Sequence, residues 1–245
     1  MKTAIITGAS GAIGGALVKK FALNGYFVVA QYNLNKRAID GVIKDLETDG
    51  IYDTVFPFRA DFTKTEDVRV LYDYAIKNFK KVDVLVNNAG VDLYKLITET
   101  EEREYDEVFD VNVKSAYFLS GYCLKEMIER GNGKIVFISS IWGKVGGSME
   151  TAYSASKSAL IGLTKALAKE VAPSKINVNC ICPGVIHSPM NDIFDEEEKQ
   201  DLIERTPLKS MGKVEDVSEL AYFLCSEQSS FITGEVVTVD GGFTL

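Results

Sequence analysis

Short runs of apolar residues recur along the chain and alternate with longer stretches of helical periodicity. Many of these runs are apolar at nearly every position, which is typical of strands covered by helices on both faces. Between the runs, apolar residues such as Ile13, Leu17 and Phe21 recur every three or four positions, as on the buried face of a helix. The runs predict strands at residues 3–7, 26–32, 54–58, 82–88, 134–140, 176–182 and 235–240.

The order of these elements predicts the fold class. Strands that alternate with helices are typical of an α/β protein with a parallel, doubly wound sheet. We therefore expect a Rossmann fold in which a seven-stranded parallel sheet carries helices on both faces. The chain has 245 residues and shows no internal repeat or clear linker, so a single domain is expected to span residues 1–245.

Charge and cysteine content narrow the range of partners. A net charge of −8 disfavours nucleic acid and anionic membranes, which are also negatively charged. The sequence shows no signal-peptide pattern and no apolar run long enough to span a membrane, so a cytoplasmic location is expected. Four cysteines and a single histidine favour buried free thiols over a metal site.

A glycine-rich stretch, TGASGAIGGA, follows the first predicted strand and has glycines at positions 8, 11 and 14. A bare turn that opens a helix presents backbone N–H groups to an anion, which is how dinucleotide-binding folds hold a pyrophosphate. The helix is expected to begin near Ile13 and to end at Asn24 and Gly25. The spacing differs from G-x-G-x-x-G, and a tight structural turn would explain one or two of the glycines.

A serine, a tyrosine and a lysine form the strongest chemical pattern. Tyr153 and Lys157 are four positions apart on a predicted helix, so they share a face. A cation beside a phenol lowers its pKa, and the hydroxyl of Ser140, at the end of the preceding strand, can hold a carbonyl oxygen. Together they can protonate an oxygen while a hydride reaches its carbon. Alone, Tyr-x-x-x-Lys is equally typical of an exposed tyrosine beside a solvated lysine.

These motifs resemble those of the short-chain dehydrogenase/reductase family over nearly the whole chain. The pattern T-G-x-x-x-G-x-G is matched at Thr7, Gly8 and Gly14, whereas Ala12 replaces the middle glycine and Gly11 lies one position earlier. The segments NNAG (87–90), ADF (60–62), YSASK (153–157) and PG (183–184) follow the family's order. Similar stretches such as GKVEDVSELAYFL and ITGEVVTVDGGF most resemble bacterial 3-oxoacyl-[acyl-carrier-protein] reductases.

The resemblance implies a role for each residue of the site. Tyr153 would be the general acid/base, Lys157 would bind the nicotinamide ribose, and Ser140, thirteen positions before the tyrosine, would hold the carbonyl oxygen in preference to Ser139. Asn112 would maintain a water-mediated proton path. Residues expected to bind the cofactor are Gly8, Ser10, Gly11, Ile13, Gly14, Tyr32, Asn33, Lys36, Asp61, Phe62, Asn88, Ala89, Gly90, Tyr153, Lys157, Pro183, Gly184, Ile186 and Ser188.

The end of the second strand bears on the choice between NADP and NAD. An aspartate there would bind the ribose 2′-hydroxyl of NAD, but this chain has Tyr32 and Asn33 at those positions. Lys36 and Arg37 follow and can reach a 2′-phosphate, although both are equally consistent with a solvated helix start. Gly11 stands where many NADP-dependent relatives have a basic residue. The sequence favours NADP and leaves NAD possible.

The C-terminal third is expected to bind the substrate. Residues 191–211 correspond to the family's substrate lid, in which Asp195 to Glu198 are interpreted as the N-cap and first turn of a short helix. Ser188 keeps the hydroxyl of the family's threonine, and His187 is interpreted as a surface or lid residue. Apolar side chains expected to line the pocket are Trp142, Val145 and Met149.

Three functions are compared. The first is NADP-dependent reduction of a 3-oxoacyl thioester, with acyl-carrier protein as a possible partner. Arg130 supports it, although this residue is equally consistent with a helix C-terminal charge, and Ser174 and Lys175 stand at a second basic position. The second is oxidation of a sugar, polyol or other small alcohol. The third, a redox-silent nucleotide sensor, is disfavoured because the catalytic positions are filled. The resemblance also implies a homotetramer.

Overall fold

The computed structural model describes residues 1–187 and 195–245. Its sheet contains seven parallel strands in the order β3-β2-β1-β4-β5-β6-β7. This arrangement confirms the predicted fold class, and the strand ends differ from the prediction by one or two residues. The strands are β1 Lys2–Ile6, β2 Tyr26–Tyr32, β3 Val55–Arg59, β4 Val84–Asn87, β5 Gly133–Ile138, β6 Ile176–Pro183 and β7 Val236–Val239.

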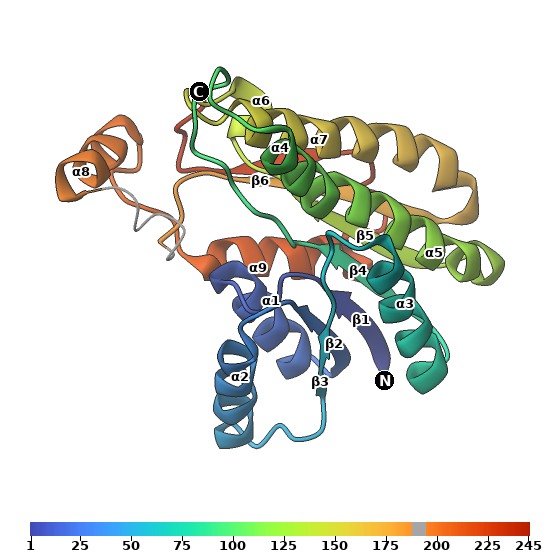
Figure 1. The fold of residues 1–245 in the computed structure, drawn as a ribbon. Coiled ribbons are helices and arrows are strands. Elements are labelled where there is room, and N and C mark those ends of the chain that lie inside the picture. Colours follow the sequence, from blue (N-terminus) through green and yellow to red (C-terminus); the bar gives the residue numbers. More distant parts are fainter. Residues whose placement is uncertain (188–194) are drawn as a thin grey trace.

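Helices cover both faces of the sheet (Figure 1). One apolar layer joins the sheet to α1 (Ala12–Leu23), α2 (Lys36–Thr48) and α9 (Val214–Leu224). The opposite layer joins it to α3 (Thr65–Phe79), α5 (Ser115–Arg130) and α7 (Thr151–Val171). Strands β1, β4 and β5 are buried between the two layers, which explains their nearly continuous apolar sequences.

The helix that follows the glycine stretch has the predicted bounds. It begins at Ala12, and its C-cap is Asn24. Gly25 then adopts a φ of +78°, a left-handed conformation that glycine reaches without a steric penalty. The glycine stretch is therefore held between a buried strand and a well-terminated helix.

The helical segment that precedes β5 is interrupted in the structure. It consists of α4 (Glu102–Phe109), a π-helical turn (Asp110–Lys114) and α5. The wider turn inserts into an otherwise regular helix, and such turns occur most often at functional sites. Asn112, which is 1 % exposed, lies in this turn. Apolar periodicity did not indicate the interruption because the apolar face continues across it.

Short elements connect the longer helices and strands. The four-residue helix α6 (Trp142–Val145) follows β5 and leads into α7. Two 3₁₀ turns, Ala172–Ser174 and Glu227–Ser229, connect α7 to β6 and α9 to β7. The strand order reverses between β1 and β4, and in doubly wound sheets ligands bind beyond the carboxyl ends of the strands at such a reversal.

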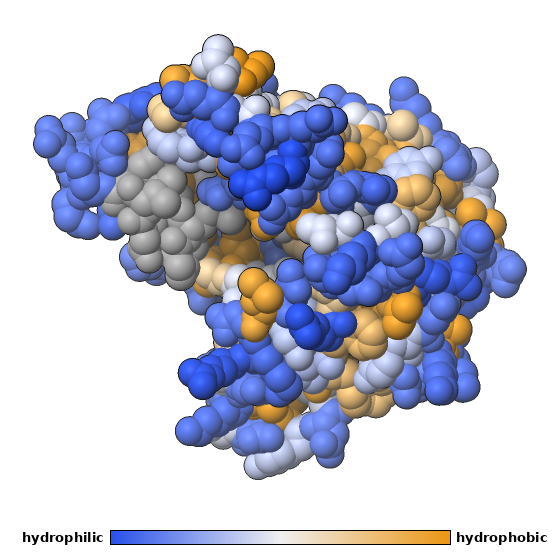
Figure 2. All heavy atoms as spheres, in the orientation of Figure 1, coloured by the Kyte–Doolittle hydropathy of each residue, from blue (hydrophilic) through white to orange (hydrophobic). Residues whose placement is uncertain are grey.

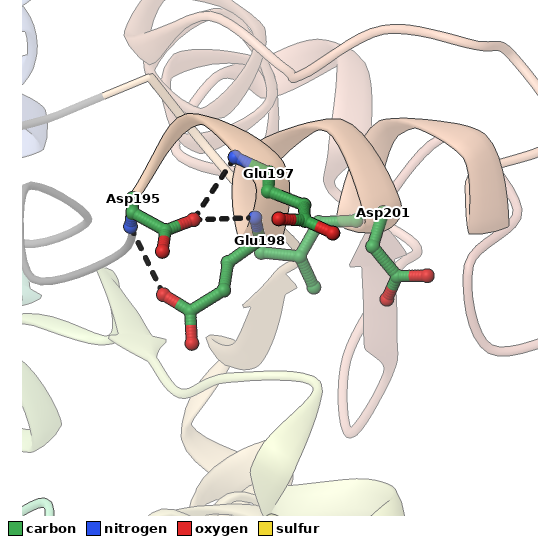
Figure 3. A pocket seen from close by; sticks show the side chains of 5 residues that line it. Asp195, Glu197, Glu198 and Asp201 are labelled. Carbon is green, nitrogen blue, oxygen red and sulfur yellow. Dashed lines mark hydrogen bonds between the residues drawn. The ribbon is translucent and has the colours of Figure 1, made fainter.

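Helix α8 (Glu196–Arg205) projects from the body of the molecule (Figure 1), and its surface is strongly hydrophilic (Figure 2). Its start has the predicted form. The Asp195 carboxylate accepts the N–H groups of Glu197 and Glu198, and the Glu198 carboxylate accepts the N–H of Asp195 (Figure 3). Four of the side chains beside the hollow shown there are acidic. Residues 191–194 of the expected lid, and Ser188, lie outside the described residues.

Candidate active site

The glycine turn after β1 has no room for side chains at two positions. Gly8 has a φ of +63°, and a Cβ there would lie 2.7 Å from the Cα of Ala89. A Cβ on Gly14 would lie 2.1 Å from the carbonyl oxygen of Gly8. Gly11 is the N-cap of α1. Among the described residues, no side chain caps the start of this helix. The first N–H groups of α1 are therefore left for an anion.

Gln31, a polar residue in an otherwise apolar strand, fixes this turn. Its side-chain oxygen accepts the N–H of Gly8 at 2.8 Å, and its side-chain nitrogen donates to the carbonyl of Ala60 at 2.8 Å. Gln31 is buried, so both bonds are shielded from water. In the sequence, Gln31 is the one amide side chain of the run YFVVAQY. The apolar pattern of this run predicts a strand but gives no role to the amide.

Thr7 joins the glycine turn to the loop after β4. Its hydroxyl oxygen accepts the N–H groups of Asn88 and Ala89, both at 2.9 Å. The side-chain amide of Asn88 donates back to the carbonyl of Thr7 at 2.9 Å. These bonds hold the two loops of the strand-order reversal side by side, so the residues predicted from TGAS and NNAG face one site.

The region expected to choose between NADP and NAD contains three basic side chains. Tyr32 ends β2, and the guanidinium of Arg59, its neighbour on β3, donates to the carbonyl of Asn33 at 3.2 Å. Lys36 begins α2 and pairs with Asp40 at 2.5 Å, whereas Arg37 is exposed beside it. Arg59 has no motif in the sequence, because only the register between β2 and β3 brings it to this position.

The other predicted cofactor residues lie along the same edge of the sheet. The Asp61 carboxylate accepts the N–H and hydroxyl of Thr63, which lowers its pKa. Phe62 is buried in the core, so only its main chain is available to a ligand. Gly90 is close to Lys157, since a Cβ there would lie 3.0 Å from the ammonium nitrogen. Ser10 and Ile13 are partly exposed at the turn, and Pro183, Gly184 and Ile186 follow the end of β6.

The proposed catalytic side chains converge between β5 and α7. Tyr153 and Ser140 are both 8 % exposed, and their hydroxyls are hydrogen-bonded to each other. The ammonium of Lys157 lies 5.5 Å from the centre of the Tyr153 ring and donates to the carbonyl of Ile138 at 3.0 Å. The sequence pattern therefore describes a buried cluster and not an exposed tyrosine beside a solvated lysine.

The two adjacent serines have different partners. The Ser139 hydroxyl donates to the carbonyl of Lys157 at 2.8 Å, which ties β5 to α7. The Ser140 hydroxyl oxygen accepts the N–H of Trp142 at 3.1 Å and faces Tyr153. This arrangement agrees with the choice of Ser140 as the residue that holds a substrate oxygen.

Asn112 connects the π-helical turn to the cluster. Its amide oxygen accepts the N–H of Val91 at 2.8 Å, and its amide nitrogen donates to the carbonyl of Val91 and to the Ser156 hydroxyl, both at 2.9 Å. The side chain therefore positions the loop after β4 and the first turns of α7. Both N–H groups of the side chain are used within the fold, so only its oxygen and the main chain remain for a water molecule.

The pKa of Tyr153 differs from the sequence-based expectation. Burial raises it above its ordinary value, the hydrogen bond with Ser140 lowers it, and the charges of Glu150 and Asp92 raise it. Burial also lowers the pKa of Lys157 to about 8. Tyr153 thus holds its proton at neutral pH, which suits a proton donor in a reduction.

Glu150, at the start of α7, is a further acidic group beside Tyr153. It is 8 % exposed, and burial followed by the charge of Asp92 raises its pKa to about 7. The sequence pattern favours the apolar residues of this segment, and not Glu150, as residues that line the pocket. Two of these apolar residues, Trp142 and Met149, are partly buried near Glu150. Val145 is exposed.

The remaining residues singled out in the sequence lie elsewhere. The exposed His187 donates its main-chain N–H to the carbonyl of Gly212 at 2.8 Å. Arg130 binds Glu126 at 2.5 Å and Asp83 at 3.2 Å, near the amino end of β4. Its charge is therefore used within the chain. All four cysteines are buried and free.

The described residues contain neither a grouped set of metal ligands nor a membrane-spanning helix. No three His, Cys, Asp or Glu side chains of residues 1–187 and 195–245 are grouped as metal ligands would be. No helix in these same ranges is both long and apolar enough to cross a membrane.

The residues present fit a nicotinamide dinucleotide. The crowded glycines leave a bare cradle in front of α1, and Gly90 leaves the Lys157 ammonium uncovered on the side of the loop after β4. Tyr153 and Ser140 lie at the same edge of the sheet as this cradle. Donors that could bind a pyrophosphate and a ribose therefore lie along one edge of the sheet.

Comparisons with known proteins agree with this site. Residues 8–244 match the family model described as enoyl-(acyl carrier protein) reductase. A 3-oxoacyl-[acyl-carrier-protein] reductase of Thermotoga maritima is 35% identical over 244 residues, which cover 100% of this chain and 98% of the relative. A reductase of the same name from Rickettsia conorii is 36% identical over 246 residues, covering 100% and 97%.

A solved structure is also similar over almost the whole chain. It is described as a putative gluconate dehydrogenase from Agrobacterium tumefaciens, and it superposes with a TM-score of 0.92 at 29% sequence identity. The match covers 99% of this chain and 95% of that one. The curated relatives and this structural neighbour thus share the fold and bear names with different substrates.

Proposed function

Because the chain belongs to the short-chain dehydrogenase/reductase family, we propose that it is an NADP-dependent reductase of 3-oxoacyl thioesters, carried on acyl-carrier protein or coenzyme A. The product is the 3-hydroxyacyl thioester. The observation that carries the chemistry is the buried cluster of Ser140, Tyr153 and Lys157. The 3-oxoacyl substrate is supported by the names of the curated relatives.

The residues of the cluster divide the work of carbonyl reduction. When bound, the nicotinamide cofactor supplies the hydride that adds to the 3-oxo carbon. Ser140 holds the carbonyl oxygen, and Tyr153 donates its proton to that oxygen as negative charge develops on it. The carbonyl π bond breaks, one C–H and one O–H bond form, and the tyrosine recovers a proton from water.

Lys157 supports this step electrostatically. When protonated, it places a positive charge beside the Tyr153 ring, which makes the tyrosine a stronger acid as its proton leaves. Asn112 acts indirectly, because its hydrogen bonds hold Val91 and Ser156 on either side of the cluster. It is therefore a positioning residue.

NADP is favoured over NAD by the charges near the end of β2. Lys36, Arg37 and Arg59 surround Tyr32 and Asn33, where an NAD-specific chain would have an aspartate. Arginine side chains bind phosphate with parallel hydrogen bonds. Asp40 competes for Lys36, so the two arginines are expected to contribute most to binding a 2′-phosphate.

The proposal also includes a cellular location, an oligomeric state and a contact with the carrier protein. We place the protein in the cytoplasm as a homotetramer built from a single domain, in which the segment around 191–211 covers the substrate. Lys175, exposed beside Ser174, is the basic residue available to an acidic carrier protein, since Arg130 is paired within the chain. No contact with nucleic acid or membrane is part of the proposal.

Oxidation of a sugar acid or polyol is the second candidate. It is favoured by the similarity to the putative gluconate dehydrogenase structure and by the acidic side chains of α8, which would repel an acidic carrier. The same Ser140, Tyr153 and Lys157 would serve. Tyr153 would first lose its proton to water and then accept the proton of the alcohol, while the hydride leaves the alcohol carbon for the oxidised cofactor.

Initial rates distinguish the two functions. The purified chain is tested for reduction of acetoacetyl-CoA with NADPH and with NADH, and for reduction of NADP and NAD with gluconate and a panel of polyols. The proposal predicts turnover of acetoacetyl-CoA with NADPH well above NADH. Turnover confined to polyols would refute the 3-oxoacyl assignment, and a preference for NADH would refute the assignment of NADP.

A further inference from the structure

Glu150 presents a polar atom that the fold does not use. Its side chain is more than nine-tenths buried, and its Oε2 atom has no hydrogen-bond partner among the described residues. A buried polar atom without a partner destabilises the folded state. An unpartnered carboxyl group beside the reacting tyrosine requires an explanation, and a ligand group that completes its hydrogen bonding provides one.

The main chain aims this side chain at the site of reduction. Met149 adopts a φ of +61°, and its carbonyl accepts the N–H of Lys95 at 2.6 Å. Glu150 follows as the N-cap of α7, three positions before Tyr153, and thus shares a helical face with it. Its Oε2 lies 3.1 Å from the position that a Cβ would take on Gly147, where Trp142 is also close.

The charge of Glu150 acts on the Tyr153 hydroxyl, as does that of Asp92. The carboxyl group therefore lies on the substrate side of Tyr153, between the loop after β4 and the segment that joins α6 to α7. Any substrate group that binds Glu150 would therefore have to be close to the reacting carbonyl.

The neighbouring cations are bound to other groups. The ammonium of Lys95 binds both carboxylate oxygens of Glu104 at 3.1 and 2.8 Å, and that of Lys144 binds the Thr238 hydroxyl at 2.6 Å. Lys157 donates to the carbonyl of Ile138. The nearby charge that acts on Glu150 is the negative one of Asp92.

These surroundings favour the neutral carboxyl group. Burial and the like charge of Asp92 raise its pKa to about 7, so a large share of the molecules carry an O–H there at and below neutral pH. A neutral carboxyl in an apolar site is a hydrogen-bond donor that requires an acceptor. A carbonyl oxygen is such an acceptor.

A 3-oxoacyl thioester has a second carbonyl, two carbons along the chain from the reacting one. We propose that the protonated carboxyl group of Glu150 donates a hydrogen bond to this thioester carbonyl oxygen while Ser140 and Tyr153 bind the 3-oxo oxygen. This inference rests on the proposed function and makes Glu150 the residue that recognises the 1,3-relation of the two carbonyls. Ionised Glu150 would repel the same oxygen.

The test uses two substrates and two variants of the full-length enzyme. Acetoacetyl-CoA is compared with its thioether analogue, S-(3-oxobutyl)-CoA, in which a methylene replaces the thioester carbonyl. Glu150→Gln retains a donor that does not titrate, and Glu150→Leu removes the donor at similar size. The parameter kcat/KM is measured with NADPH from pH 6 to pH 8, after circular dichroism and thermal unfolding show that each variant is folded.

The wild type is expected to lose roughly ten-fold in kcat/KM for acetoacetyl-CoA between pH 6 and pH 8, as a group with a pKa of about 7 ionises. Its preference for the thioester over the thioether at pH 6 is expected to be roughly ten-fold, the value of one hydrogen bond. Glu150→Gln should keep this preference at both pH values, and Glu150→Leu should lose it. A structural role alone would not change the preference between the substrates.

Two results would overturn the inference and leave the proposed function intact. One is an undiminished preference for the thioester in Glu150→Leu. The other is the same fall in thioester preference with pH in Glu150→Gln as in the wild type. If the wild type reduces neither substrate, the proposed function itself fails and this inference fails with it.

Discussion

Ser139 and Ser140 illustrate how single residues divide between structure and chemistry. They are adjacent, similarly buried and identical in type, yet one hydroxyl bonds the main chain of α7 and the other bonds the Tyr153 hydroxyl. The direction of successive side chains at the end of β5 makes this difference. The sequence could point to Ser140 only through a spacing of thirteen residues to the tyrosine.

Replacement of each serine tests this division. Ser140→Ala should lower kcat for ketone reduction by roughly 10²–10³-fold, since it removes a donor to the developing charge. Ser139→Ala should leave kcat within a few-fold and lower the free energy of unfolding by about 1 kcal/mol through the lost bond to the Lys157 carbonyl. Steady-state kinetics and urea unfolding measure both effects. Equal kcat values for the two variants would contradict the assignment.

The buried ammonium of Lys157 predicts a pH dependence of its own. Its pKa of about 8 lies below that of an exposed lysine because burial disfavours the charged form. As pH rises through this value, Tyr153 loses the adjacent positive charge. We expect kcat at saturating substrate to fall about ten-fold per pH unit above pH 8. A kcat that stays constant to pH 9.5 would show that the charge of Lys157 is not required.

At the scale of elements, the turn between β1 and α1 shows why glycine spacing alone is a weak signal. Two adjacent glycines of α1 differ in their surroundings. A Cβ on Gly14 would collide with the Gly8 carbonyl oxygen, whereas one on Gly15 would lie 3.4 Å from a methyl group of Val42. The turn therefore requires glycine at position 14 but not at position 15.

The pair provides a matched experiment. Gly14→Ala should force the turn apart, with a loss of about 1–3 kcal/mol in the free energy of unfolding and at least ten-fold weaker cofactor binding. Gly15→Ala should instead raise thermal stability slightly, because alanine is the better helix former by about 1 kcal/mol. Thermal unfolding and NADPH fluorescence titration measure these changes. Normal cofactor affinity in Gly14→Ala would exclude this turn as the binding cradle.

Helix α8 offers a second element-scale prediction. Its first turn depends on Asp195, which accepts two main-chain N–H groups. Among the described residues, Asp201 instead forms an exposed pair with Arg205 at 3.5 Å. Asp195→Ala should destabilise the helix locally by about 1 kcal/mol and raise KM for substrate without changing cofactor affinity. Asp201→Ala is the control. Unchanged KM in Asp195→Ala would argue against a lid that includes α8.

For the whole molecule, the apolar pattern was sufficient to predict the sheet. Strands buried on both faces have nearly continuous apolar sequences, and each strand before β7 is followed by a helix. The positions of Tyr153, Lys157 and Ser140 also followed from local spacing. The contributions of Gln31 and Arg59 did not, because they depend on which strands are neighbours and in which register.

The remaining differences have the same origin. The π-helical turn at Asn112 keeps the apolar face of its helix, so periodicity passes over it. Burial raises the pKa of Tyr153, whereas a neighbouring cation alone would lower it, and burial also raises the pKa of Glu150. This burial depends on contacts among α7, β5 and the loop after β4. Local sequence therefore predicts which groups are present at the site, and the tertiary fold determines their protonation.

The central claim is that Tyr153 delivers the proton in carbonyl reduction. The most direct test is kcat for acetoacetyl-CoA reduction in Tyr153→Phe, measured together with the dissociation constant of NADPH. We predict a loss in kcat of roughly 10²–10⁴-fold, the usual contribution of a general acid, with NADPH affinity within a few-fold of the wild type. A Tyr153→Phe enzyme that keeps most of its kcat would contradict the account.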